Sequence, residues 1–265
     1  MHNTPSLVGF GTVAADYQPV DGCLKDRVIL VTGASGSIGR VAAMTFAKYG
    51  ATVILHGRKN SRLDPVYDAI EAAGFAQPAN IVLDFLTATE TDYKGMAETI
   101  FASFKRLDGI FHAASHMEPL TPLAMQNLTS WNAHFAVNVL APVSVTRVCL
   151  PMLKRAPGKN GNVVFLSETH AIAPKAYWGA FATSKATLSN IATIWNDELQ
   201  HESALRLRTL VPGPIASHMR AMSHPGELPT EVAPVDSLIK HMMYLISGDA
   251  PLDAPLIFIK TSPLP

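Results

Sequence analysis

The sequence predicts a doubly wound α/β fold with a seven-stranded parallel sheet in a single domain. From residue 27 onward, short apolar runs rich in β-branched residues alternate with longer segments of helical pattern. The short runs are apolar throughout, as expected when helices cover both faces of a sheet. No linker interrupts the alternation before residue 260, and strand–helix alternation of this kind is typical of parallel sheets.

The strands are expected, in order, at residues 27–33, 51–57, 80–85, 109–115, 162–168, 205–213 and 254–260. Helices are expected at residues 41–50, 65–73, 91–106, 130–153 and 179–201. Gly50 is placed to end the first helix, because glycine readily adopts the left-handed conformation found there. Residues 1–24 are expected to form an irregular arm, and residues 25–265 the domain. Residues 214–233, rich in Pro, Met and His, form either a lid over a ligand or an ordered surface loop.

The charge balance and the cysteine count narrow the class of protein. Among 265 residues, 21 Lys and Arg oppose 21 Asp and Glu, so the formal net charge is zero. A nucleic-acid partner requires a basic face, and none is indicated. Two cysteines fit a reducing compartment better than a disulfide framework. The N-terminus lacks the basic start of a secretory signal, and polar residues interrupt the most apolar stretch, 135–150, so we expect a cytoplasmic protein with no membrane partner.

The segment VILVTGASGSIGR places a glycine-rich turn between the first strand and the first helix. Glycines let the backbone approach a pyrophosphate, and the N-terminus of the following helix offers free N–H groups. This context favours a dinucleotide site, although a tight turn without a ligand has the same pattern. After the second strand, Gly57 and Arg58 stand where an acidic residue selects NAD. Arg58 either pairs with a 2′-phosphate, which favours NADP over NAD, or is an ordinary solvated side chain.

The turn TGASGSIG resembles the TGxxxGxG turn of the short-chain dehydrogenase/reductase family, and the resemblance extends from about residue 24 to residue 259. It includes the HAAS block of the fourth strand and the PGPIAS segment after the sixth. The resemblance implies a Rossmann fold, a nicotinamide cofactor, an oxidoreductase acting on an unidentified small-molecule carbonyl or enone, and a homodimer or homotetramer. The cofactor-binding positions that it implies are Gly33, Ser35, Ser37, Ile38, Gly39, Arg58, Asp84, Ala113, Lys185, Pro212, Gly213 and Ser217.

Some positions that matter for catalysis in that family are changed in this chain. Family members carry a Tyr-x-x-x-Lys pair whose tyrosine passes a proton to the substrate oxygen, and a serine that bonds the same oxygen. Lys185 and Asn138 are present, but Phe181 and Glu168 replace the tyrosine and the serine. Ser37 replaces the middle glycine of the turn. Because loss of a general acid slows a reaction by roughly 10²–10⁴-fold, ordinary carbonyl reduction should be severely impaired.

Two side chains are candidates for the missing acid. Glu168 ends the fifth strand and either donates a proton at a raised pKa or only neutralises Lys185 in a site without turnover. Tyr177 lies eight residues before Lys185 and would stack below Phe181 if the helix began early enough. No metal site is expected, because the histidines after strand ends lack a recognised ligand spacing; they are His112, His116, His170 and His218.

Two functions from different classes fit these residues. One is an NADP(H)-binding oxidoreductase with rewired catalysis. The alternative is a catalytically inactive binding, sensing or assembly protein that keeps the cofactor on the same scaffold, and fold alone does not decide between them. The helix after the fifth strand carries an apolar stripe that packs either on the chain's own sheet or on a second copy; its members are Leu188, Ile191, Trp195 and Leu199.

Overall fold

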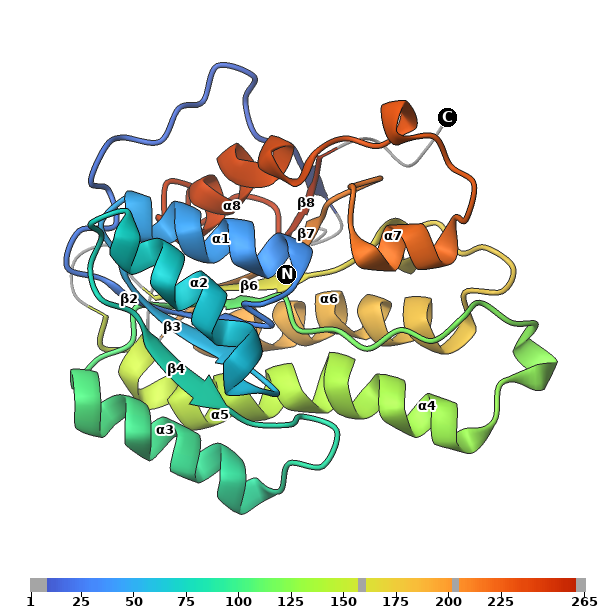
Figure 1. Cartoon of the computed structure of the whole chain (residues 1–265), viewed down its shortest axis with the longest axis horizontal. Coiled ribbons are helices and arrows are strands. Elements are labelled where there is room, and N and C mark those ends of the chain that lie inside the picture. Colours follow the sequence, from blue (N-terminus) through green and yellow to red (C-terminus); the bar gives the residue numbers. More distant parts are fainter. Residues whose placement is uncertain (1–8, 157–160, 202–204, 261–265) are drawn as a thin grey trace, which may run out of the picture.

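The structure is a computed structural model that describes residues 9–156, 161–201 and 205–260. Eight parallel strands form one sheet in the order β1-β8-β7-β6-β5-β2-β3-β4, with helices on both faces (Figure 1). The predicted doubly wound fold in a parallel sheet is therefore confirmed. The sheet has eight strands, one more than the seven expected from the sequence.

The elements lie close to the predicted ranges. The strands are β1 (Phe10–Gly11), β2 (Val28–Thr32), β3 (Thr52–Gly57), β4 (Ala79–Val82), β5 (Gly109–His112), β6 (Asn162–Leu166), β7 (Arg206–Val211) and β8 (Ile257–Ile259). The α-helices are α1 (Ser37–Lys48), α2 (Asn60–Ala72), α3 (Glu90–Phe104), α4 (Leu128–Phe135), α5 (Ala141–Leu153), α6 (Gly179–Leu199), α7 (His218–Ser223) and α8 (Ile239–Ile246). Shorter helical turns are η1 (Leu123–Met125), η2 (Ala136–Leu140), η3 (Thr169–Ala171), η4 (Pro229–Glu231) and η5 (Val235–Leu238).

The additional strand comes from the segment expected to be an irregular arm. Phe10 and Gly11 pair in parallel with Ile257 and Phe258 of β8. Glycine suits this position, because a Cβ on Gly11 would lie 2.9 Å from Cε1 of Phe258. A strand of two residues has no hydrophobic period that a sequence pattern reveals. Residues 1–8 of the predicted arm and residues 261–265 of the predicted domain lie outside the described part.

Two hydrophobic cores lie on opposite faces of the sheet. Side chains alternate along a strand, so Ile29 and Val31 of β2 join the core under α1, α2 and α8, whereas Val28 and Leu30 join the core under α3, α5 and α6. Figure 1 shows these two layers of helices. Three of the four members of the α6 stripe, Leu188, Trp195 and Leu199, belong to the second core or pack against it. The stripe therefore packs on the chain's own sheet.

The single helix expected at 130–153 is interrupted by a π-helical turn. α4 and α5 are joined by η2, a π-helix. Pro142 contributes to this break, because it has no N–H to donate to the carbonyl of Asn138 four residues earlier. Among the described residues, Leu128–Leu153 is the one stretch with the length and mean hydropathy, 1.5, of a membrane span, and 44% of that window is buried inside the protein. α5 packs against α3 and the sheet, as a core helix does.

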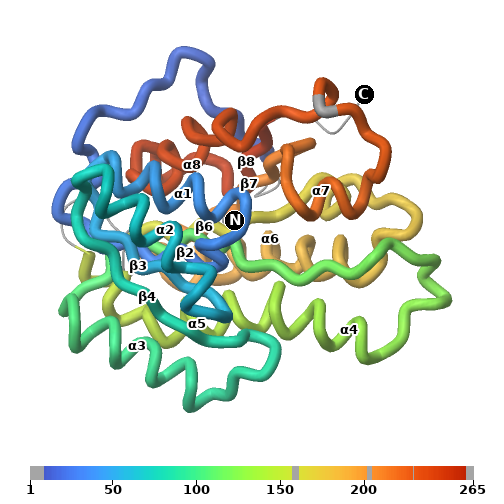
Figure 2. Tube along the Cα trace, viewed as in Figure 1, coloured from blue at the N-terminus to red at the C-terminus, as the bar shows by residue number. Residues whose placement is uncertain are grey.

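The crevice of a doubly wound sheet lies where successive connections leave in opposite directions. β2 pairs with β3 on one side and with β5 on the other, so the crevice opens at the carboxyl ends of these strands. Figure 2 traces the chain from the ends of the central strands toward α7 at the right of the view. The predicted lid, residues 214–233, contains α7 and η4, and Ile215 forms a β-bridge with Ala233 at its base.

Candidate functional site

A cavity of about 600 Å³ lies at the carboxyl ends of the central strands. Its walls come from the glycine turn before α1, the ends of β3 and β4, the segment after β5, the end of β6, the start of α6, and the lid. All of the predicted cofactor-binding residues and two of the predicted catalytic residues line it; these are Gly33, Ser35, Ser37, Ile38, Gly39, Arg58, Asp84, Ala113, Glu168, Lys185, Pro212, Gly213 and Ser217.

The glycine turn is built by close backbone approaches. Gly33 has φ +66°, and a Cβ there would lie 2.7 Å from Cα of Ala114, so only glycine fits between β2 and the segment after β5. A Cβ on Gly39 would lie 2.1 Å from the carbonyl oxygen of Gly33. The first and last glycines of the pattern thus hold the chain in a tight strand-to-helix turn.

The N-terminus of α1 faces the cavity with unused donors. Gly36 is the N-cap residue and supplies no side-chain cap, and the first turn contains no acidic residue. Helix N-termini of this kind attract anions through free N–H groups and the helix dipole. The turn therefore fits the diphosphate of a dinucleotide.

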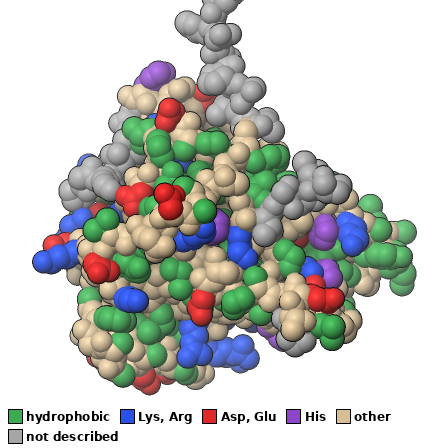
Figure 3. Space-filling view, turned by 90° about the horizontal axis from the view of Figure 1, so that it is seen from above, with side chains coloured by type: hydrophobic (Ala, Val, Ile, Leu, Met, Phe, Trp, Pro, Cys, Tyr) green, Lys and Arg blue, Asp and Glu red, His purple; other side chains and the backbone are tan. Residues whose placement is uncertain are grey.

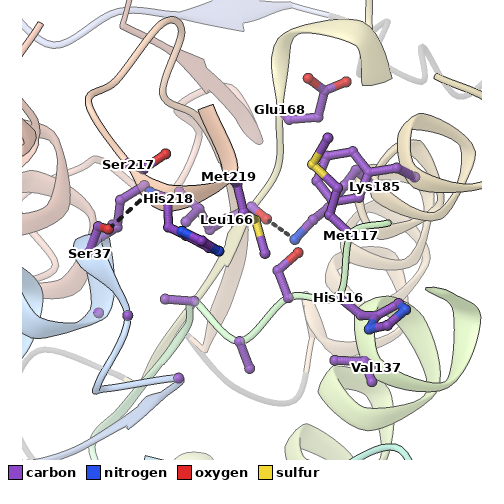
Figure 4. A pocket seen from close by; sticks show the side chains of 18 of the residues that line it. Ser37, His116, Met117, Val137, Leu166, Glu168, Lys185, Ser217, His218 and Met219 are labelled. Atoms are coloured by element: carbon purple, nitrogen blue, oxygen red, sulfur yellow. Dashed lines mark hydrogen bonds between the residues drawn. The ribbon is translucent and has the colours of Figure 1, made fainter. Parts of the chain in front are cut away.

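Ser37, where the family pattern has glycine, lies at the edge of the cavity (Figure 4). Its hydroxyl accepts a hydrogen bond of 3.4 Å from the backbone N–H of His218, the first residue of α7. Gly36 takes the N-cap position one residue earlier. The serine side chain therefore bridges to the lid instead of closing the turn.

Basic side chains lie at the far end of the cavity from the lid. Arg58 follows β3 and is exposed, and Arg62 of α2 lines the same region. Asp84, after β4, accepts a hydrogen bond from the backbone N–H of Leu86 at 3.0 Å. Two guanidinium groups are suited to a phosphate group. Arg62 was not among the predicted site residues, although its place in the first turn of the helix after Arg58 could have indicated it.

Lys185 and Glu168 lie at the opposite end, where β6 ends and α6 begins. Lys185 is 3% exposed, and its Nζ donates to the carbonyl oxygen of Leu166 at 3.0 Å. Burial lowers the pKa of Lys185 to about 8, an effect that the charge of Glu168 opposes. Burial raises the pKa of Glu168 to about 7, against the backbone N–H groups of His170 and Ala171 and the charges of Lys185 and Arg220.

One oxygen of Glu168 is left without a partner. Oε1 is buried and has no hydrogen bond within the described part of the chain. Buried polar atoms are nearly always paired, and an exception calls for an explanation such as a functional role. A carboxyl group with a pKa near neutrality can hold or release a proton there. Glu168 therefore stays a candidate for the missing proton donor.

Aromatic and sulfur-containing side chains surround this end of the cavity. Phe181 and Trp178 are both 7% exposed and form a small hydrophobic cluster with Met117 and Met219. The Phe181 ring centroid lies 5.9 Å from Nζ of Lys185, so the phenyl group occupies the place of the family tyrosine. The ring of Trp178 contacts that of His170, with centroids 4.3 Å apart and the planes tilted by 52°. Figure 4 shows Met117 and Met219 on either side of the Lys185 amine.

Asn138 and Tyr177, the other two predicted catalytic residues, do not line this cavity. Asn138 is 1% exposed and clamps the segment after β5: Oδ1 accepts the N–H of His116 at 2.7 Å, and Nδ2 donates to the carbonyl oxygen of His116 at 2.9 Å. Nδ2 also donates to Ser184 Oγ. The amide thus acts as a clamp, an orientation set by its place in η2 that sequence spacing does not show.

Tyr177 lies outside α6, on which it would stack below Phe181 only if that helix began earlier. α6 begins at Gly179, with Trp178 as its N-cap residue. Tyr177 precedes the cap, has φ +76° and is 56% exposed. Gln126 donates to its carbonyl oxygen at 3.4 Å. Its phenol therefore faces outward and cannot replace the missing tyrosine in this cavity.

The histidines do not converge on a metal. Among the described residues, no three His, Cys, Asp or Glu side chains lie close enough to bind a metal ion. His112 is buried, bonded to Thr146 Oγ1 at 3.0 Å, and burial lowers its pKa to about 3. His116, His170 and His218 line the cavity separately.

An ion pair joins two residues of the predicted lid, residues 214–233. The Nε of Arg220 donates to Oε2 of Glu227 at 2.6 Å, and its Nη2 pairs with Oε1. Ser217 caps α7 by accepting the N–H of Arg220 at 3.1 Å. Met219 and Met222 of α7 line the cavity. These lid residues were not predicted individually, because nothing in the Pro- and Met-rich pattern shows which side chains face inward.

Comparisons with known proteins agree with this geometry. The family model for short chain dehydrogenases matches residues 27–227. The oxidoreductase YciK of Escherichia coli K12 is 37% identical over 88% of this chain and 91% of its own length. A short chain dehydrogenase of Shigella flexneri 2a complexed with NADP is 34% identical, with a TM-score of 0.86 over 91% of this chain and 99% of its own. One of Escherichia coli CFT073 complexed with NADPH is also 34% identical, with a TM-score of 0.86 over 93% and 100%.

Proposed function

Since the chain belongs to the short-chain dehydrogenase family, we propose that it is an NADP(H)-dependent oxidoreductase. In this proposal Glu168 takes the place of the family tyrosine and serine and donates the proton to the reacting group of the substrate. The observation that carries this proposal is the buried carboxyl of Glu168, with its unpartnered Oε1, in the same cavity as the Lys185 amine. Bound cofactor would supply hydride.

The residues of the cavity divide the work between binding and reaction. The turn from Gly33 to Gly39 and the N-terminus of α1 would hold the diphosphate. Arg58 and Arg62 would hold a 2′-phosphate, which favours NADP over NAD. Lys185, fixed by Leu166, would contribute positive charge near the reacting group. A protonated Glu168 would then donate the proton that a carbonyl or enone needs after hydride addition.

Glu168→Gln tests this proposal in the full-length protein. The change keeps the shape of the side chain and removes its titration. NADPH oxidation with a panel of ketones, enones and imines should fall by about 100-fold or more for every substrate that the wild type reduces, while NADPH affinity changes little. Turnover equal to that of the wild type would show that the proton comes from elsewhere.

A second function is favoured by one observation, the phenyl ring of Phe181 against Lys185. With no proton at that position, the chain could keep the cofactor for sensing or assembly. Saturable NADPH binding with no turnover of any substrate in the panel would support this second function and count against the first.

The oligomeric state and the subcellular location of the protein are also proposals. Leu140 of η2 and Ile194 of α6 are 59% and 57% exposed, on the helices that family members use in dimers and tetramers. In Figure 3, further hydrophobic side chains gather at the end of the molecule where η1 and the start of α4 lie; the exposed ones there include Leu123, Met125 and Leu128. We propose a homo-oligomer in the cytoplasm, and light scattering of the purified chain would test the assembly.

A further inference from the structure

The reaction end of the cavity has an unusual combination of groups. Its walls are apolar and aromatic, from Trp178, Phe181, Met117 and Met219. Glu168 is the acidic side chain on these walls, since Asp84, the other acidic lining residue, follows β4 at the other end. Glu168 thus shares these walls with two aromatic rings. A carboxylate and aromatic ring faces both attract a cation, because the ring faces carry negative electrostatic potential.

Two hydroxyl groups near this end already donate hydrogen bonds within the protein. Ser167 Oγ donates to the carbonyl oxygen of Lys185 at 3.3 Å, and Ser115 Oγ donates to Oδ1 of Asn138 at 3.2 Å. Phe181 offers no hydroxyl. A ketone would therefore lack the tyrosine and serine hydroxyls that polarise its oxygen and protonate the alkoxide in the family, and would depend on Glu168 for its proton.

A protonated C=N group does not need those donors. It is already polarised by its own positive charge, and it already carries the proton that a ketone must obtain from the enzyme. Its N–H can also donate to a carboxylate, and the Glu168 side chain lines the cavity. The Lys185 ammonium and the Arg220 guanidinium lie in the same cavity and would oppose such a substrate. Arg220 is neutralised by its ion pair with Glu227, and burial lowers the pKa of Lys185 to about 8.

We propose that the preferred substrate is a small, largely apolar imine in its protonated form, whose N–H donates to the Glu168 carboxylate among Trp178, Phe181 and the two methionines. Hydride from reduced nicotinamide dinucleotide adds to the imine carbon and forms a C–H bond. The C=N π electrons become the lone pair of an amine nitrogen, and the nicotinamide is left oxidised. No further proton is consumed in this step. The inference rests on the proposed oxidoreductase function and adds the class of substrate; for an imine, Glu168 binds the cation as a carboxylate instead of donating the proton that a carbonyl or enone needs.

A pair of matched ligands tests the inference without turnover. Tetrahydroisoquinoline is a cation at neutral pH, and isochroman has the same shape with an oxygen in place of the nitrogen. Calorimetric titration of the full chain, with and without NADP, should give an affinity for the amine about tenfold or more above that for the ether. Glu168→Gln should bring the ratio close to one.

A second carboxyl provides the control. Glu118 accepts hydrogen bonds from Ser130 at 2.6 Å outside the main cavity, and Glu118→Gln should keep the preference for the amine. With NADPH, dihydroisoquinoline should be reduced about tenfold or more faster than tetralone, an aryl ketone of similar size.

Two results would overturn the inference: equal affinity for the amine and the ether in the wild type, or a preference that survives Glu168→Gln. A parallel NADPH titration separates this failure from that of the proposed function. If NADPH does not bind, the oxidoreductase proposal and the imine reduction that rests on it both fail. If NADPH binds but the amine is not preferred, only the substrate class is wrong.

Discussion

At one end of the cavity, the turn from Gly33 to Gly39 presents backbone N–H groups and is shaped by contacts that exclude a Cβ. At the other, Glu168, Phe181 and Lys185 present side chains whose identity differs in two of three positions from the family pattern. Phosphate binding depends mainly on backbone geometry, so we expect it to tolerate a serine at position 37. Proton transfer depends on particular side chains, so the same degree of change alters the chemistry.

The largest effect on NADPH affinity should come from distorting the glycine turn, residues 33–39. In Gly39→Ala, the new Cβ would lie 2.1 Å from the carbonyl oxygen of Gly33, so the turn must shift and NADPH affinity should fall by about 100-fold or more. Gly95→Ala on α3 is the matched control, because nothing lies within 4 Å of a Cβ there. Fluorescence titration with NADPH measures both. Normal affinity in Gly39→Ala would mean that the turn does not shape the phosphate site.

Restoring the family residues at the end of the cavity that holds Lys185 should raise the activity with ketones. The double variant Phe181→Tyr with Glu168→Ser recreates the family pair beside Lys185, and its rate with simple ketones should rise by about tenfold or more above the wild type. NADPH oxidation under identical ketone concentrations measures the gain. Tyr177→Phe, which removes a phenol that is 56% exposed, should change nothing. No gain in the double variant, with NADPH still bound, would count against a simple two-residue loss.

The smallest effect on cofactor affinity should come from removing the exposed Arg58 side chain. Arg58→Ala removes a guanidinium that would pair with a 2′-phosphate, and salt screens such a contact, so NADPH affinity should fall by about fivefold and NADH affinity should stay the same. Arg40→Ala removes an exposed arginine of α1 that does not line the cavity. Titrations with both cofactors measure the four affinities. Equal losses for NADPH and NADH would assign Arg58 a role other than cofactor selection.

The sequence predicted best what is repeated or sterically constrained. The apolar runs identify the seven longest strands, and the glycine pattern identifies the turn because Gly33 and Gly39 have no room for a Cβ. The ending of α1 near Gly50 was likewise predicted, and Gly50 has φ +100°. These features depend on local chemistry that a sequence records directly.

What the sequence did not predict depends on orientation. The sequence did not show that the amide of Asn138 clamps the backbone of His116, and its role in catalysis stays a prediction. The sequence did not show which way Tyr177 faces; it precedes α6, which begins at Gly179 as expected, and it is 56% exposed. β1 consists of two residues and is recognised through its pairing with β8. Each depends on tertiary contacts that no local period encodes.

The central claim is that the backbone end still binds cofactor although the reaction end has changed. Titration of the wild-type chain with NADPH and with NADH, followed by fluorescence and thermal shift, tests it most directly. The account predicts saturable NADPH binding with a raised unfolding temperature, and weaker binding of NADH. Folded protein that binds neither cofactor would contradict the account. The glycine turn would then only connect β2 to α1 and would not bind phosphate.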